Sequence, residues 1–122
     1  MEASRRREIA RALDGEHARA LGRIESLTRD LHEIIEGSND AARDDEHDPE
    51  GNTIAFERAQ VAALLEAARL QLDDIEVAQG RLAAGEHHRC AACGAAIPEE
   101  RHDARPTART CVRCAGQSAR SS

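Results

Sequence analysis

The chain contains four cysteines, which are grouped along the sequence in two pairs. Two residues separate the members of each pair, and 17 residues separate the pairs. The resulting C-x2-C-x17-C-x2-C spacing is typical of a four-thiolate zinc site, because one tight turn can present two sulfurs to the same ion. Gly94 follows the second cysteine and permits the open backbone that such a turn needs. We therefore predict one zinc ion per chain, bound by Cys90, Cys93, Cys111 and Cys114.

Two disulfides are the alternative use of these cysteines. The first residues, Met1 to Arg7, run into a polar helical pattern without the apolar segment of a secretory signal. We therefore expect a cytoplasmic chain, in which thiols stay reduced. Four thiolate ligands leave no position open for water, so the predicted zinc is structural and not catalytic.

The composition favours long helices over a large globular core. The chain has 122 residues, 33% of them charged, and Phe56 is its one aromatic residue. Its net charge of -6 makes it a poor binder of polyanions. No apolar run approaches the roughly 20 residues that span a bilayer. We also expect no enzyme activity and no catalytic residues, because the sequence offers neither a glycine-rich phosphate loop nor a nucleophile with its base.

A first long helix is predicted from about residue 4 to residue 36. Apolar residues return there with alternating steps of four and three, the pattern of a coiled-coil seam. The seam comprises Ala10, Leu13, Ala20, Ile24, Leu27, Leu31 and Ile34, with His17 in the same register. We expect His17 to be an interface residue and not a metal ligand. Gly37, Ser38 and Asn39 are expected to end the helix.

A second long helix follows with the same rhythm. Its seam comprises Ile54, Val61, Leu65, Ala68, Leu72, Ile75 and Leu82, with Arg58 and Gln79 as polar members. The helix begins either with Asp48 as N-cap and Pro49 in the first position, or one turn later at Asn52 or Thr53. Gly85 is the expected residue after its C-terminus.

These patterns predict an all-α dominated fold, in which a long antiparallel helical hairpin is followed by a small C4 zinc finger. Each helix would be about 50 Å long. Pairing within one chain closes only a short loop, so we favour a monomeric hairpin over a dimer that zips through the same seams. The expected divisions are a hairpin over residues 1–86, a finger over 87–116 and a disordered tail over 117–122.

The connector of the hairpin is strongly acidic, and we call residues 38–52 the acidic tip. Six acidic residues and one arginine lie between Asp40 and Glu50. Solubility is the simplest role for such a loop. A carboxylate cluster on a projecting arm is also suited to a basic surface or a cation held by a partner. The candidate partner-binding residues are Asp44, Asp45, Glu46, Asp48 and Glu50. We expect Phe56, just beyond them, to pack at this end of the hairpin.

The cysteine region resembles the zinc finger of the DksA/TraR family. The shared pattern is C-x2-C-G-x2-I-x3-R-x3-R-P-T-A-x2-C-x2-C, which begins at Cys90 and ends at Cys114. The order of parts, a helical hairpin before a C4 finger, is similar too. His87 and His88 stand where the family has other residues, and we expect them to lie near the site or on the surface and not to bind the metal.

The resemblance implies a protein that binds bacterial RNA polymerase without binding DNA. In that family the coiled coil enters the secondary channel, and carboxylates at its tip approach the active site. The family's tip motif, D-x-x-D-x-A, is matched here by Asp45 and Asp48, whereas Glu50 replaces the alanine. A transcription regulator is therefore the leading hypothesis. A DNA-binding zinc finger and a zinc-stabilised coiled-coil adaptor are the alternatives.

Overall fold

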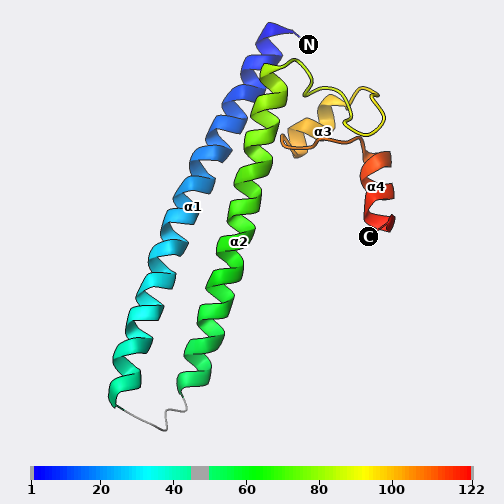
Figure 1. Cartoon of the computed structure of the whole chain (residues 1–122). Coiled ribbons are helices and arrows are strands. Elements are labelled where there is room, and N and C mark those ends of the chain that lie inside the picture. Colours follow the sequence, from blue (N-terminus) through cyan, green and yellow to red (C-terminus); the bar gives the residue numbers. More distant parts are fainter. Residues whose placement is uncertain (1, 45–49, 122) are drawn as a thin grey trace. The chain divides into compact units, whose positions relative to one another are not determined.

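The computed structural model describes the backbone of residues 2–44 and 50–121 and the side chains of residues 2–37 and 51–117. Within this part of the chain lie four helices: α1 (Ala3–Asp44), α2 (Glu50–Ala83), α3 (Glu99–Ala104) and α4 (Val112–Ser121) (Figure 1). The one β-type contact in these residues is an isolated antiparallel bridge between Arg89 and Ala96. The all-α prediction is confirmed. None of the helices described is both long and apolar enough to cross a membrane.

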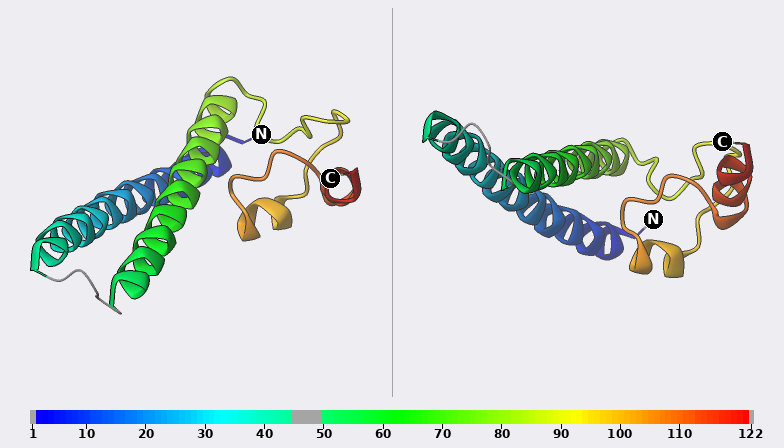
Figure 2. Two further views of the ribbon diagram at one scale, coloured as in Figure 1. Left: turned by 60° about the horizontal axis from the view of Figure 1, so that its bottom comes forward. Right: turned by 90° about the horizontal axis from the view of Figure 1, so that it is seen from below.

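Two compact units make up the chain. One unit contains Met1–Ala18 and Asp73–Ser122, and the other contains Arg19–Leu72. In each unit a segment of α1 lies beside a segment of α2 that runs in the opposite direction (Figures 1 and 2). This is the pairing predicted for a helical hairpin. The start of α1 and the end of α2 belong with the cysteine region, so the compact units do not divide near residue 86.

The first unit has a small apolar core between its two helix segments. Ile9 and Leu13 of α1 pack with Ala78 and Leu82 of α2, and all four are buried. Ala10, which we placed in the seam, is only partly buried against this cluster. The seam of α1 therefore begins at Ile9.

Polar seam residues of the first unit pair across the helices. Gln79 donates a hydrogen bond to Asp14 Oδ1 at 3.0 Å. The His17 Nε2 atom lies 3.8 Å from Glu76 Oε1. His17 is thus an interface residue, as predicted. Because these polar groups find partners, the seam tolerates them without leaving a buried group unpaired.

The second unit buries little of its seam. Ala20, Leu65 and Ala68 are buried, the other apolar seam residues described there are half-buried, and the polar seam residue Arg58 is exposed. Phe56 is 69% exposed, so the expectation that it packs at the end of the hairpin is wrong. A pair of helices without a third layer can cover only one stripe of each helix, and Phe56 lies off that stripe.

The predicted helix stop at Gly37 is also wrong, because α1 continues to Asp44. Glycine costs a helix about 1 kcal/mol relative to alanine, and Ala41, Ala42 and Arg43, good helix formers, follow it. A glycine ends a helix most effectively where it adopts a positive φ. Among the residues described, only Gly85 and Gly94 do so.

The ends of the other helices differ from the expectations in two places. Helix α2 begins at Glu50, so Asn52 and Thr53 lie inside it and the later of the two predicted starts is wrong. Both helices extend into the segment that we expected as a connector. Helix α4 reaches Ser121, so residues 117–121 are helical in backbone where we expected a disordered tail.

Helix α2 ends at Ala83, and Gly85 lies just after its C-terminus as predicted, with a φ of +76°. The Gly85 amide donates to the Leu82 carbonyl at 3.1 Å, and the Glu86 amide donates to the Arg81 carbonyl at 2.8 Å. These two bonds form a Schellman motif. The motif turns the chain out of α2 and into the cysteine region.

Candidate metal centre

The four cysteines lie together in the first unit. Their Sγ atoms are all within 4.8 Å of one another, and those of Cys93 and Cys111 are 3.9 Å apart. Four sulfurs at about 2.3 Å from a zinc ion form a tetrahedron with edges of about 3.8 Å. The cluster therefore fits one zinc ion. It is the one group of three or more potential metal ligands among the residues described, and it includes neither His87 nor His88.

The first cysteine pair sits in a tight turn, which we call the first knuckle (residues 90–94). The Cys90 amide donates to the Ala95 carbonyl at 2.7 Å, and the Gly94 amide donates to the Cys90 carbonyl at 2.9 Å. Gly94 has a φ of +77°, a left-handed conformation that glycine adopts without steric cost. The turn brings Cys90 and Cys93 to the same side, as the spacing predicts.

The second pair, which we call the second knuckle (residues 111–114), is formed by the start of a helix. Cys111 immediately precedes α4, and its carbonyl accepts a hydrogen bond from the Ala115 amide at 3.0 Å. Cys114 consequently lies in the first turn of α4. The first knuckle is linked to the segment before the second by a hydrogen bond from the Ala91 amide to the Arg109 carbonyl at 2.8 Å.

The protonation of the thiols is uneven before a metal binds. Hydrogen bonds from the backbone of Cys111 and then Cys93 lower the pKa of Cys90 to about 6. Hydrogen bonding to the sulfur of Cys111, and then to those of Cys90 and Cys93, raises the pKa of Cys114 to about 12. Zinc binds thiolates, so an incoming ion must displace the protons that remain. One structural zinc ion per chain is the cofactor that this donor set suits.

Two buried histidines lie beside the knuckles. The rings of His87 and His102 stack with their centroids 4.0 Å apart. His87 Nε2 lies 2.7 Å from the Pro106 carbonyl, and His102 Nε2 lies 3.0 Å from the Ala108 carbonyl. Each ring therefore donates from Nε2. Desolvation by burial lowers the pKa of both histidines.

The sequence reasoning missed His102, because nothing in its local pattern distinguishes it from a surface residue of a short polar helix. It placed His87 near the site or on the surface, and the structure shows it 1% exposed, beside the site and outside the ligand set. Buried apolar side chains of the finger segment are few, namely Cys90, Ile97 and Ala108.

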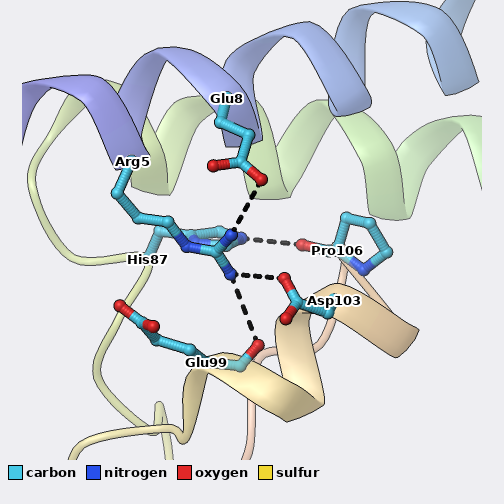
Figure 3. A network of polar contacts seen from close by, with 6 residues as sticks. All are labelled: Arg5, Glu8, His87, Glu99, Asp103 and Pro106. Atoms are coloured by element: carbon cyan, nitrogen blue, oxygen red, sulfur yellow. Dashed lines mark hydrogen bonds and ion pairs between the residues drawn. The ribbon is translucent and has the colours of Figure 1, made fainter.

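Two arginines of α1 bond to other parts of the first unit, and Figure 3 shows the contacts of Arg5 with α3. Arg5 of α1 donates to Asp103 Oδ1 at 2.7 Å and to the Glu99 carbonyl at 3.4 Å. Its hydrogen bond with Asp103 raises the pKa of Arg5, which therefore stays charged. Arg6 donates to the carbonyls of Leu82 and Ala83 at 3.0 Å and so caps the C-terminus of α2. These contacts also escaped the sequence reasoning.

The acidic tip lies largely outside the residues that the structure describes. Asp44 is the last residue of α1 and Glu50 is the first of α2, and their side chains are not among those described. Asp45, Glu46 and Asp48 fall in the interval between the helices, outside the described residues. The partner-binding role of these five residues therefore stays a prediction.

Comparison with known proteins supports the zinc finger. The family profile described as "Prokaryotic dksA/traR C4-type zinc finger" matches residues 77–118. No curated protein sequence matches the chain significantly. Among solved structures, transcription factor DksA2 from Pseudomonas aeruginosa matches with a TM-score of 0.81 and 22% identity, over 98% of this chain and 87% of that one.

The profile match includes the last turns of α2, both knuckles and the start of α4. The structural match extends over the long helices as well, and at 22% identity it establishes the shared fold. The fit of four sulfurs to one ion and the family profile agree on the metal. Residues 77–118 therefore match the DksA/TraR C4-type zinc finger, their four cysteines bind one structural zinc ion, and the chain has the fold of a DksA2 structure.

Proposed function

We propose that this protein is a transcription regulator that binds bacterial RNA polymerase and inserts its helical hairpin through the secondary channel. The observation that carries the proposal is the occurrence of a DksA/TraR finger in a chain whose whole fold matches a structure described as a transcription factor. The acidic residues concentrated between α1 and α2 support the proposal that this end of the hairpin enters the channel first.

In this proposal the finger and the tip have separate roles. The four cysteines hold the finger together and take no part in chemistry, because a fully thiolate-bound zinc has no open position. Asp45 and Asp48 act at the partner's active centre. A carboxylate near a bound cation, or near the arginines and lysines around it, changes the local electrostatic energy without catalysing a reaction. Asp44, Glu46 and Glu50 add to the negative potential of the tip.

The test is a comparison of binding and transcriptional effect. Wild type and the double variant Asp45→Asn/Asp48→Asn are titrated into purified RNA polymerase and assayed in transcription initiation. Asp73→Asn/Asp74→Asn is the matched control, because these two exposed carboxylates of α2 lie far along the sequence from the tip. We expect equal binding by all three proteins and loss of the transcriptional effect in the tip variant alone. Absence of polymerase binding at low salt would refute the proposal.

A second candidate function is direct binding to duplex DNA. Arg105, Arg109 and Arg113 are exposed in the finger, and no salt bridge to them is seen among the described residues. Against this, the net charge of the chain is -6. Binding to DNA through phosphates would be strong at low ionic strength and fall steeply with salt. We expect no shift of duplex DNA at low salt, and a steep salt dependence would favour this second function instead.

A further inference from the structure

In the residue directly before each cysteine pair, the backbone carbonyl accepts a hydrogen bond from an arginine side chain. Arg81 Nη2 donates to the carbonyl of Arg89 at 2.6 Å. Arg101 Nε donates to the carbonyl of Thr110 at 2.7 Å. Arg89 comes directly before Cys90, and Thr110 comes directly before Cys111. The same contact thus occurs at the same point of both knuckles, although the two arginines come from different helices.

The contact at the first knuckle bridges a turn of the chain. Arg81 lies in the last turn of α2, and the same Nη2 atom also donates to the Glu86 carbonyl at 3.0 Å. One guanidinium therefore holds both ends of residues 86–89, the segment that leads from the Schellman motif to Cys90. This segment has little apolar burial of its own, since His87 is its one buried residue. Its path depends on hydrogen bonds.

The contact at the second knuckle depends on α3. Arg101 is a half-buried residue of α3, and this helix is held from outside the finger by the bonds of Arg5 to Asp103 and to the Glu99 carbonyl (Figure 3). The contacts therefore run from α1 to α3 and from α3 to the residue before Cys111. Hydrogen bonds from a charged donor are stronger than those between neutral groups.

We propose that Arg81 and Arg101 are positioning residues of the zinc site, which hold the backbone at Cys90 and Cys111 so that the four sulfurs converge before the ion binds. Arg5 supports Arg101 by fixing α3. None of the three makes a hydrogen bond to a sulfur. Arg81 and Arg101 act through main-chain carbonyls, and Arg5 acts through the Asp103 carboxylate and the Glu99 carbonyl. This inference concerns retention of zinc and does not depend on the proposed interaction with polymerase.

The alternative is that the arginines only balance charge. Four thiolates and one Zn²⁺ carry a net charge of -2, and any nearby guanidinium would stabilise such a cluster. Arg109 and Arg113 serve as controls for this effect. Both are exposed, both lie within two residues of Cys111 in the sequence, and no hydrogen bond from either side chain is seen among the described residues. Removal of their charge tests neutralisation without disturbing the two carbonyl contacts.

The experiment measures zinc release from the full-length, zinc-loaded protein to an excess of a chromogenic chelator. The variants are Arg81→Ala, Arg101→Ala and Arg101→Lys, with Arg109→Ala and Arg113→Ala as controls. Loss of groups that orient metal ligands typically costs 10- to 100-fold in affinity. We expect release from Arg81→Ala and Arg101→Ala to be faster by about that factor, with the controls at the wild-type rate.

Arg101→Lys separates position from charge, because lysine keeps the charge but has no donor at the place of Nε. We expect it to release zinc nearly as fast as Arg101→Ala. The Co²⁺-loaded forms provide a second readout, since the visible absorption of tetrahedral thiolate Co²⁺ should weaken and broaden in the two alanine variants and not in the controls.

The inference is overturned if Arg101→Lys behaves as wild type, or if Arg113→Ala accelerates release as much as Arg101→Ala. Either result would assign the arginines to charge balance. If an alanine variant fails to fold, which far-UV circular dichroism would show, Arg5→Ala replaces it. That change lies outside the finger and leaves Arg101 intact, and we expect it to accelerate release by a smaller factor. Release at the wild-type rate would contradict the role of α3.

Discussion

His87 and His102 show how much of the finger's stability rests on single polar residues. Both rings are buried, each Nε2 is paired with a carbonyl, and desolvation lowers the pKa of both below the ordinary value of 6.5. The groups that face them include Arg81 and His88 for His87, and Arg5, Arg101 and Asp103 for His102. Most of these groups are cationic, so a proton on either ring meets repulsion as well as desolvation.

This arrangement predicts that the free energy of unfolding decreases as the pH falls. In the unfolded chain both histidines take up protons near pH 6.5, while in the folded chain they stay neutral to lower pH. The unfolded state therefore binds more protons below about pH 6.5, and the free energy of unfolding decreases as the pH falls from there through the folded pKa. Urea unfolding of the zinc-loaded protein between pH 7.5 and 5.5 measures this slope.

Protonation of the cysteines also weakens zinc binding as the pH falls, so the measurement needs a control. His102→Gln keeps a side-chain N–H donor near the Ala108 carbonyl and cannot titrate. We expect a shallower dependence of stability on pH in this variant. An identical slope in both proteins would mean that His102 contributes nothing to it.

The cysteines and arginines of the finger show which parts of the site can be predicted from the sequence. The cysteines were predictable because their spacing alone defines a four-thiolate site. The contact between Arg5 and Asp103 was not, because it joins residues 98 positions apart and has no local signature. Arg101 belongs to the pattern that the finger shares with the DksA/TraR family, but neither its contact nor that of Arg81 was predictable, since the sequence does not show which carbonyl an arginine reaches.

At the scale of elements, Gly37 and Gly85 show why helix ends are hard to predict. Both were expected to stop a helix, yet α1 continues through Gly37, whereas α2 ends at Ala83, just before Gly85. The difference is backbone conformation, since only Gly85 has a positive φ and the bonds of a Schellman motif. The apolar periodicity located both long helices correctly, because it reflects the whole length of a helix. Helix ends depend on a few residues and their tertiary contacts.

A pair of glycine substitutions tests this account. Gly85→Ala places a Cβ in a left-handed backbone conformation, which costs about 1–2 kcal/mol. Gly80→Ala lies inside α2, where alanine is favoured by about 1 kcal/mol. Outside the local backbone, no atom lies within 4 Å of a Cβ built at either position, so contacts with the rest of the protein do not enter the comparison. We expect Gly85→Ala to lower the free energy of unfolding and Gly80→Ala to raise it, as measured by chemical denaturation. Changes of the same sign in both variants would contradict the assignment.

At the scale of the whole molecule, two kinds of stabilisation divide the chain. The long helices of 42 and 34 residues depend on their own hydrogen bonds and on an apolar seam. The region after Gly85 buries few apolar side chains and depends on the zinc ion and on arginine contacts. The sequence indicated this division from composition and spacing. It did not reveal that the start of α1 and the end of α2 form a compact unit with the finger.

This division predicts the effect of removing zinc from the whole protein. A structural zinc site contributes its binding free energy to folding, so chelation should unfold the region after Gly85 and leave most of α1 and α2 helical. The chain contains no lysine, so trypsin cleaves it only after arginine. We expect the zinc-loaded protein to resist cleavage at Arg89, Arg101 and Arg109, and the chelated protein to be cut there first. The far-UV circular dichroism spectrum of the chelated protein should keep most of its helical signal.

Two results would contradict this prediction. Equal protection of these arginines with and without zinc would show that side-chain contacts alone stabilise the finger. Loss of the helical signal together with the finger would show that the long helices depend on the finger.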